Sequence, residues 1–382
     1  MKFTCKTINL RNAILKVERI VSRQTTLPIL SNILLSTDKG RIVISATNLE
    51  IAIKAYIGAK IEKEGKITIP PRILGGFLNT ITDEVITGNL LENELKINSE
   101  NHKIKIKGIN AKDFPIIPNV PASSFISVDL EAFTQAVSGI LISVARNDTR
   151  QELNGVFMRF GNKSLTLAAT DSFRLTEVKT NLINVESKNE YKAYKEKMPS
   201  VIIPSLAFTE LQRITDEGAL YIMVDQNQLF LSTKTTKIIS RLINGNYPEY
   251  EQVLPKKYDI TIKVEKEELI KALKIASLIT NNPNGEVLFQ SSKDGKNLTL
   301  KAQSIDTGDN ISTITANING PEFEVLFNCR YLLEGLNSVL FNQPFVELKL
   351  NKQKSPVLLQ NAGSEENTPL SFSYVIMPII KG

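Results

Sequence analysis

The sequence predicts an α+β protein of three repeated domains, each with two helices packed on antiparallel sheets. Three observations support this class: the length, a succession of segments that occurs three times in the same order, and period-2 apolar alternation between the predicted helices. The chain has 382 residues, enough for two or three domains with cores of their own. Its 42% hydrophobic and 23% charged residues are typical of a globular protein.

Composition excludes several classes of protein. The two cysteines, Cys5 and Cys329, exclude a disulfide scaffold and a four-cysteine zinc site, and the single histidine, His102, argues against a histidine-based triad. No apolar run approaches the ~18 residues of a membrane span, and the first ten residues contain no hydrophobic signal region. We therefore expect a cytoplasmic protein without a metal, a cofactor or a membrane segment.

Four landmarks define the repeat. The first is a short alternating strand followed by an amphipathic helix, over Lys2–Arg23, Ser124–Asn147 and Tyr258–Thr280. The second is a hairpin-like stretch ending in a small polar pair, which aligns Thr47, Thr170 and Gln303. The third is a strand entering a second helix, which aligns Leu74, Phe208 and Leu332. The fourth is a closing residue before proline: Phe114-Pro115, Tyr247-Pro248 and Met377-Pro378.

The landmarks predict domains of about 127 residues, one third of 382. We place the domains at residues 1–120, 121–254 and 255–382, with proline-containing linkers near 116–124 and 253–258. The charged stretch Ser187–Pro199 has no counterpart in the other repeats and is predicted to be an exposed loop or a short helix.

Antiparallel strands are predicted between the two helices of each repeat. Alternating segments are separated by turn sequences at Asp38-Lys39-Gly40, Gly161-Asn162-Lys163 and Asp294-Gly295. Such short connections join neighbouring strands, so each domain is predicted to be a meander with two helices.

The first predicted helix, Leu10–Arg23, has one apolar and one basic side. The apolar side contains Leu10, Ile14, Val17 and Val21, and the opposite side contains Asn12, Lys16, Arg19 and Arg23. The equivalent helix of the third repeat presents Lys266, Lys271 and Lys274. A solvated helix face is one interpretation. If the repeats surround an axis, the other is a shared basic surface that contacts phosphates without reading sequence.

No nucleotide-binding or hydrolase motif occurs, but an enzymatic alternative remains. Asp148, Glu152 and Asp171 are candidate Mg²⁺ ligands of a nuclease, although two of them have the setting of turn or cap residues. A rod-like scaffold of repeats is a third possibility. A strand that alternates Lys103, Lys105 and Lys107 with Ile104 and Ile106 is either a guarded edge or an edge that pairs with another subunit.

Several segments resemble the bacterial DNA sliding clamps, the β subunits of the replicative DNA polymerase. They are TLPILSNILL, TRQELNGVFM, AATDSFRL, NYPEYEQVLP and YVIMPI, and the resemblance extends over essentially the whole chain in order. It implies a head-to-tail dimeric ring of six domains, with helices lining the hole and sheets outside. It also implies a non-catalytic processivity factor that encircles double-stranded DNA and tethers polymerases, with polymerase and clamp-loader subunits as partners.

The resemblance implies a cleft that receives a short linear peptide from these partners. The matching residues are Leu153, Thr170, Ser172, Phe173, Arg174, Leu175, Pro248, Val253, Val375, Ile376, Met377 and Pro378. Apolar members would receive hydrophobic anchors, and Thr170 and Arg174 would shape the rim. The family often has Gly-His where this chain has Ser172-Phe173, which predicts a more apolar floor.

Two further surfaces follow from the same resemblance. Residues implied to face DNA are Lys16, Arg19, Arg23, Gln24, Arg150, Lys271 and Lys274; Gln24 aligns with a DNA-contacting arginine of some members. Residues implied at the dimer interface are Ile104, Ile106, Leu278 and Ile279.

Overall fold

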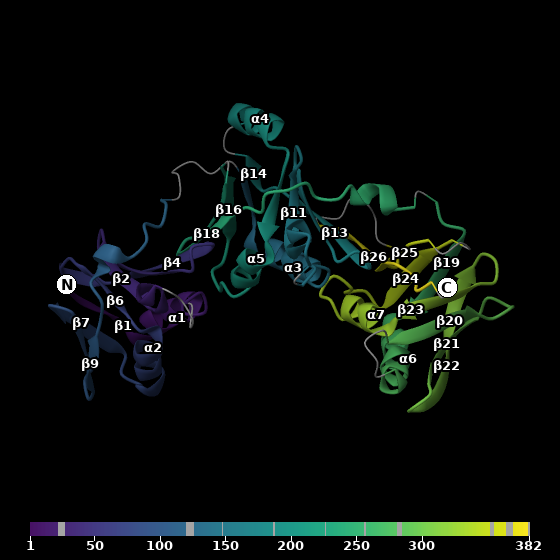
Figure 1. The fold of residues 1–382 in the computed structure, drawn as a ribbon, viewed down its shortest axis with the longest axis horizontal. Helices are drawn as coiled ribbons and strands as arrows, with labels where there is room; N and C mark the ends of the chain where they lie inside the picture. The colour runs from purple at the N-terminus through teal and green to yellow at the C-terminus, as the bar shows by residue number, and fades with distance from the viewer. Residues whose placement is uncertain are drawn as a thin grey trace. The chain divides into compact units, whose positions relative to one another are not determined.

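The structure is a computed structural model that describes residues 1–21, 27–119, 126–146, 148–185, 188–225, 227–255, 257–280, 285–351, 355–363 and 370–380 (Figure 1). Contacts divide the chain into two compact units, which we describe one at a time. The first unit contains residues 1–130, 183–193 and 206–242. The second unit contains residues 131–182, 194–205 and 243–382.

Seven helices occur in the described part of the chain. They are α1 (Thr7–Val17), α2 (Pro71–Thr80), α3 (Leu130–Leu141), α4 (Lys188–Lys197), α5 (Ser205–Leu211), α6 (Lys266–Ile279) and α7 (Cys329–Leu336). Four short 3₁₀ helices accompany them: Pro28–Ser31, Ala111–Asp113, Gln151–Asn154 and Tyr250–Val253. The first and third predicted domains therefore have two helices each. The second has three, because α4 is the short helix allowed by the unmatched charged stretch. The helix after the first strand ends at Val17, earlier than predicted.

Two antiparallel sheets form the first unit. Five strands are ordered β5 (Lys60–Lys63), β1 (Lys2–Lys6), β7 (Val85–Leu91), β8 (Glu94–Asn98) and β9 (Lys103–Lys107). Nine strands are ordered β14 (Asn184–Val185), β10 (Ile126–Asp129), β16 (Ala219–Val224), β17 (Gln228–Ser232), β18 (Thr236–Arg241), β4 (Ile51–Gly58), β3 (Arg41–Thr47), β2 (Ile33–Asp38) and β6 (Lys66–Ile69).

The second unit contains one succession of twelve strands. The order is β15 (Ser200–Pro204), β11 (Gly155–Phe160), β12 (Ser164–Thr170), β13 (Arg174–Asn181), β26 (Leu370–Ile376), β25 (Val357–Asn361), β24 (Phe345–Leu350), β19 (Ile260–Glu265), β22 (Gly308–Asn319), β21 (Asn297–Ser304), β20 (Glu286–Ser291) and β23 (Glu324–Asn328).

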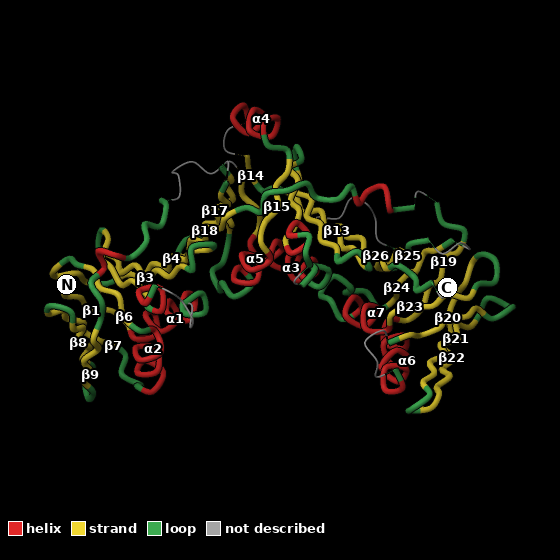
Figure 2. Tube along the Cα trace, viewed as in Figure 1, coloured by secondary structure: helices red, strands yellow, loops and turns green. Residues whose placement is uncertain are grey.

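Helices such as α1 and α6 pack on strands of their own unit because each presents an apolar stripe (Figure 2). In α1, the buried side chains include Leu10, Ile14 and Val17, as predicted, and the helix packs on β3, β4 and α2. In the third domain α6 packs on β21, β22 and α7. The predicted first turn is a tight hairpin in which Lys39 and Gly40 have φ of 44° and 77°, the left-handed values that a type I′ turn requires.

Backbone pairing continues from one repeat into the next. Within the first unit, β4 of the first domain pairs with β18, the last strand of the second. Within the second unit, β13 of the second domain pairs with β26, the last strand of the third. Strand β22 holds the place of β4 and β13 in the third repeat. Its Gly308–Thr315 half pairs with β21 and its Ala316–Asn319 half with β19.

Candidate functional site

A tight turn between β12 and β13 forms one wall of a cavity in the second unit. Thr170 Oγ1 donates to the carbonyl oxygen of Arg174 at 2.7 Å, and Asp171 Oδ1 accepts the backbone N–H groups of Phe173 and Arg174 at 3.0 and 2.9 Å. Ser172 has a φ of 75°. Side-chain acceptors for successive N–H groups make this turn stable although a non-glycine residue occupies the left-handed region.

The floor of the cavity is apolar because strands of two domains meet there. In the β13–β26 ladder Leu175 is opposite Val375, and both are buried. The fully buried Leu153 comes from the 3₁₀ helix Gln151–Asn154, and Met377 follows β26. The cavity has a volume of about 250 Å³, suited to one or two side chains of a ligand.

Polar groups form the rim. The guanidinium of Arg174 bonds Asp171 at 3.0 Å, pairs with Glu334 and lies 4.4 Å from the ring centre of Tyr331. Burial opposes its charge, but Tyr374 and Glu334 outweigh that effect and the pKa of Arg174 lies above its usual value. These contacts fix the side chain, so it acts as a rigid part of the wall.

Tyr250 lines the cavity, and the neighbouring Tyr247 supports the turn that forms its wall. The Tyr250 hydroxyl donates to Glu177 Oε2 at 2.6 Å, and burial together with Glu177 raises the pKa of this tyrosine. Tyr247 accepts the backbone N–H of Thr170 at 3.0 Å, and its ring stacks on Phe157 with centres 5.2 Å apart. Both phenols are neutral at physiological pH, so the ring of Tyr250 adds surface to the cavity without charge.

Most of the residues predicted for the peptide cleft lie around this one cavity. They are Leu153, Thr170, Ser172, Arg174, Leu175, Pro248, Val253, Val375 and Met377. Three other predicted residues do not line it. Ile376 is fully buried on the other side of β26, Phe173 is 60% exposed and stacks on Tyr331, and Pro378 follows the lining residue Met377.

Three lining residues were not predicted for the cleft: Arg150, Glu249 and Tyr250. Arg150 was expected to face DNA, but its guanidinium bonds Asp148 at 3.1 Å and Ser172 Oγ at 2.8 Å at the mouth of the cavity. Glu249 and Tyr250 follow Pro248 directly in the segment NYPEYEQVLP. The second tyrosine of this segment could therefore have been predicted as a lining residue of the cavity.

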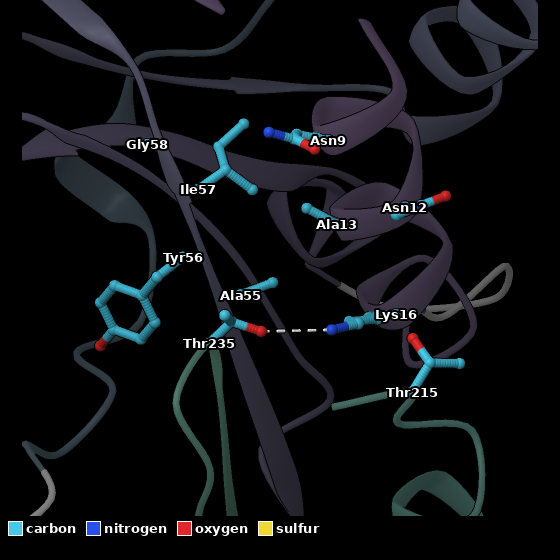
Figure 3. A pocket seen from close by; sticks show the side chains of 10 residues that line it. All are labelled: Asn9, Asn12, Ala13, Lys16, Ala55, Tyr56, Ile57, Gly58, Thr215 and Thr235. Carbon is cyan, nitrogen blue, oxygen red and sulfur yellow. Dashed lines mark hydrogen bonds between the residues drawn. The ribbon is translucent and has the colours of Figure 1, made fainter. Parts of the chain in front are cut away.

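Lys16 differs most from its predicted role. It extends from α1 toward Thr235 across a second cavity, which lies between α1 and β4 (Figure 3). Its ammonium pairs with Asp216 Oδ1 at 2.7 Å, and the two side chains are only 13% and 8% exposed. The prediction of a free outward cation is therefore wrong for Lys16, because a carboxylate far along the chain takes up its charge.

The carboxylate of Asp216 is fully engaged. It accepts hydrogen bonds from Lys16, from the hydroxyls of Thr233 and Thr235 and from the Thr235 backbone N–H. Burial alone would raise the pKa of Asp216, but these donors lower it to about 2. The network joins α1 of the first domain to the second domain inside the first unit.

The other predicted DNA-facing residues differ in their settings. Arg19 and Lys274 are exposed, and Lys271 is exposed beside Glu268, with Nζ and Oε1 2.9 Å apart. Arg23 and Gln24 lie outside the described residues.

The predicted interface residues are also mixed. Leu278 is 70% exposed and Ile279 half-buried. Ile104 is half-buried and Ile106 only 2% exposed, since both face the first domain's own core. Among the described strands β9 has β8 as its one neighbour, so its other backbone edge has no partner strand there.

The geometry does not support the nuclease alternative. Asp148 is bound by Arg150 and Asp171 by Arg174, so these carboxylates are already neutralised. Among the described residues no group of three His, Cys, Asp or Glu side chains could hold a metal ion. None of the described helices has the length and apolar character of a membrane span.

Comparisons with known proteins match the chain throughout. Family profiles described as the N-terminal, central and C-terminal domains of the DNA polymerase III beta subunit match residues 1–118, 127–249 and 251–380. The beta sliding clamp of Synechocystis sp. is 28% identical over 394 residues, and that of Chlamydia muridarum is 25% identical over 382, each alignment covering 99% of both chains. The solved DNA polymerase sliding clamp from Bacillus subtilis, 22% identical, superposes over 100% of both chains with a TM-score of 0.90.

Proposed function

The chain belongs to the DNA polymerase III beta subunit family, the bacterial sliding clamps, and on this premise we propose that two copies close head to tail into a ring around duplex DNA. As a sliding clamp it is a processivity factor and a non-catalytic polymerase subunit. A closed ring cannot leave the duplex sideways. Its contacts can therefore be weak and independent of sequence, which allows sliding.

The main support for a ring is the strand pairing between successive repeats. The β4–β18 and β13–β26 ladders join a middle strand of one repeat to the last strand of the next. Two strand edges equivalent to these have no partner of this kind within the described chain. They are the Gly308–Thr315 half of β22, equivalent to β4 and β13, and β9, the last strand of the first repeat. Strand β22 of one copy can pair with β9 of a second copy, and β22 of the second with β9 of the first. These two pairings occupy all the free edges of this kind and close the assembly.

Side chains at these two edges support the same pairing. Strand β9 carries Lys103, Lys105 and Lys107, whereas the free half of β22 carries Asp309. Ile311 on β22 is 64% exposed, and Leu278 at the end of α6 is 70% exposed. Opposite charge and uncovered apolar surface are typical of an interface that a second copy covers.

Cations on the helical side would contact the duplex. Arg19 follows α1, and Lys271 and Lys274 lie on the equivalent helix α6, where all three are exposed. The link between Lys271 and Glu268 is solvent-exposed and weak, so a phosphate can replace it. Arg23 and Gln24 keep their predicted role. We place the protein in the bacterial cytoplasm, where replicating DNA lies.

The cavity around Leu175 and Met377 would receive a short apolar peptide segment of polymerase and clamp-loader subunits. Its buried floor, fixed rim and volume of about 250 Å³ suit anchoring side chains. The flexible thioether of Met377 allows different anchors to pack. A ring that slides while holding a polymerase keeps it at high effective concentration beside the primer end.

Retention on DNA tests the ring. The protein is loaded onto nicked circular DNA with a clamp loader, and the amount retained during gel filtration is measured before and after linearisation. We expect retention on the circle and loss on the linear form, with sedimentation giving twice the 42.5 kDa chain mass. Equal retention on both forms, or a monomer at micromolar concentration, would refute the proposal.

A further inference from the structure

A basic pocket lies on the face of β4 opposite α1. Successive side chains of a strand point to opposite faces. Ala55 and Ile57 are buried on the α1 side, while the Tyr56 ring is directed away from α1 (Figure 3). The pocket on this other face has a volume of about 210 Å³. It is lined by Asp38, Arg41, Lys54, Tyr56, Asn119, Thr233, Lys234 and Lys237.

Positive charge in this pocket is mostly uncompensated. The one lining carboxylate, Asp38, is 3.4 Å from the guanidinium of Arg41. Lys54 Nζ donates to the carbonyl oxygens of Ile117 and Pro118 at 3.2 and 3.3 Å. Within the described part of the chain, none of Lys54, Lys234 and Lys237 forms an ion pair. Three lining ammonium groups therefore have no carboxylate partner there.

The fold does not require this arrangement. Lys54 and Lys237 are directly opposite each other in the β4–β18 ladder, where like charges are destabilising. Burial and the charge of Lys237 lower the pKa of Lys54 accordingly. At the equivalent position of the β13–β26 ladder, Glu177 is opposite Ser373. The repeat thus accommodates other residues, and the β13–β26 ladder does not share the lysine pair.

We propose that this pocket binds a compact, multiply charged phosphate group, either free diphosphate or the phosphate tail of a nucleotide. Three ammonium groups match the charge of such a group better than that of a single carboxylate, and lysine binds phosphate well as a point charge. Arg41 and Lys237 lie 4.9 and 5.6 Å from the ring centre of Tyr56, so cations already occupy the surroundings of this ring. Recognition therefore rests on phosphate and not on base stacking. The inference does not depend on ring formation.

Calorimetric titration of the full-length protein with inorganic diphosphate at low salt tests the proposal. We expect one saturable site per chain. The double variant Lys54→Met/Lys237→Met should bind at least about tenfold more weakly, because it removes two cationic donors from the pocket. The matched control Lys66→Met/Lys112→Met removes the same charge from exposed positions outside the pocket and should bind within about twofold of the parent.

Three further arms complete the test. Lys234→Met, in an exposed turn, gives a second variant should the double variant fail to fold, and it is also expected to bind more weakly. Equal affinities of inorganic triphosphate and deoxyadenosine triphosphate identify phosphate alone as the ligand, and tighter binding of the nucleotide with the same lysine dependence identifies a nucleotide; both support the proposal. Absence of saturable binding, equal weakening in the control, or tighter binding of a hexaglutamate peptide at these lysines would overturn it.

Discussion

Removal of the Asp216 carboxylate should destabilise the first unit strongly. The Asp216→Ala variant leaves the ammonium of Lys16 without its partner, although that side chain is only 13% exposed. Leaving one member of a buried ion pair unmatched costs about 3 kcal/mol, the lower end of the usual range, since some water reaches the lysine. The pKa of Asp216, about 2 against an ordinary 3.8, corresponds to about 2 kcal/mol and agrees in order of magnitude.

Urea unfolding followed by far-ultraviolet circular dichroism measures this destabilisation. Glu217→Ala is the matched control, because the neighbouring carboxylate is exposed, and it should change the free energy of unfolding by less than about 0.5 kcal/mol. The double variant Lys16→Met/Asp216→Leu should be more stable than Asp216→Ala, since it leaves no unmatched charge. An Asp216→Ala variant as stable as the parent would show that the network carries no stability. A double variant less stable than Asp216→Ala would show that the unmatched charge of Lys16 is not the cause of the loss.

The same network predicts a pH dependence. Because the folded-state pKa of Asp216 lies below its unfolded value, its contribution is complete above about pH 4 and is lost as the pH falls through about 2. The stability difference between the parent and Asp216→Asn should therefore shrink over that interval. A difference that stays constant from pH 5 to pH 2 would mean that the ionised carboxylate is not the stabilising group.

Three other predictions concern the proposed surfaces. Arg19→Ala with Lys274→Ala should reduce the slope of log affinity for duplex DNA against log salt by about 0.9 for each phosphate that these side chains neutralise, and an unchanged slope would place both cations away from DNA. Met377→Ala should weaken binding of a fluorescent polymerase-derived peptide about tenfold, with the sedimenting mass unchanged; undiminished peptide affinity would disprove the cavity assignment. Ile311→Lys should convert dimers to monomers in sedimentation because it adds charge against the basic β9, whereas Ile116→Lys, at a 96% exposed position, should not.

Local patterns in the sequence predicted the repeat but not the pairing of charges. Helical spacing correctly placed Leu10 and Ile14 in the core and Lys16 on the other side of α1. That spacing contains no information about Asp216, which reaches Lys16 only after the second domain has packed beside the first. Arg19, three residues further on, has no such partner among the interactions of the described residues and remains exposed as predicted.

For the cavity, too, some contacts could be predicted from the sequence and others could not. Resemblance to the clamp family indicated which segments meet, because their motifs are continuous in sequence. It did not separate Val375 from Ile376, although neighbouring residues in β26 must point to opposite faces and only Val375 lines the cavity. Strand alternation would have resolved this choice. The contact of Tyr250 with Glu177, by contrast, depends on how the segment with the 3₁₀ helix Tyr250–Val253 folds back on the sheet, and the local sequence does not indicate this.

Pairing across repeat boundaries limits how the chain can be dissected. A fragment cut after residue 120 would lack β18 and would present the paired edge of β4 to solvent, leaving an apolar strand with open hydrogen-bonding groups. Such an edge invites aggregation. Fragments cut at the repeat boundaries would therefore aggregate and would not fold independently. Recombinant fragments should keep β4 together with β18, and β13 together with β26.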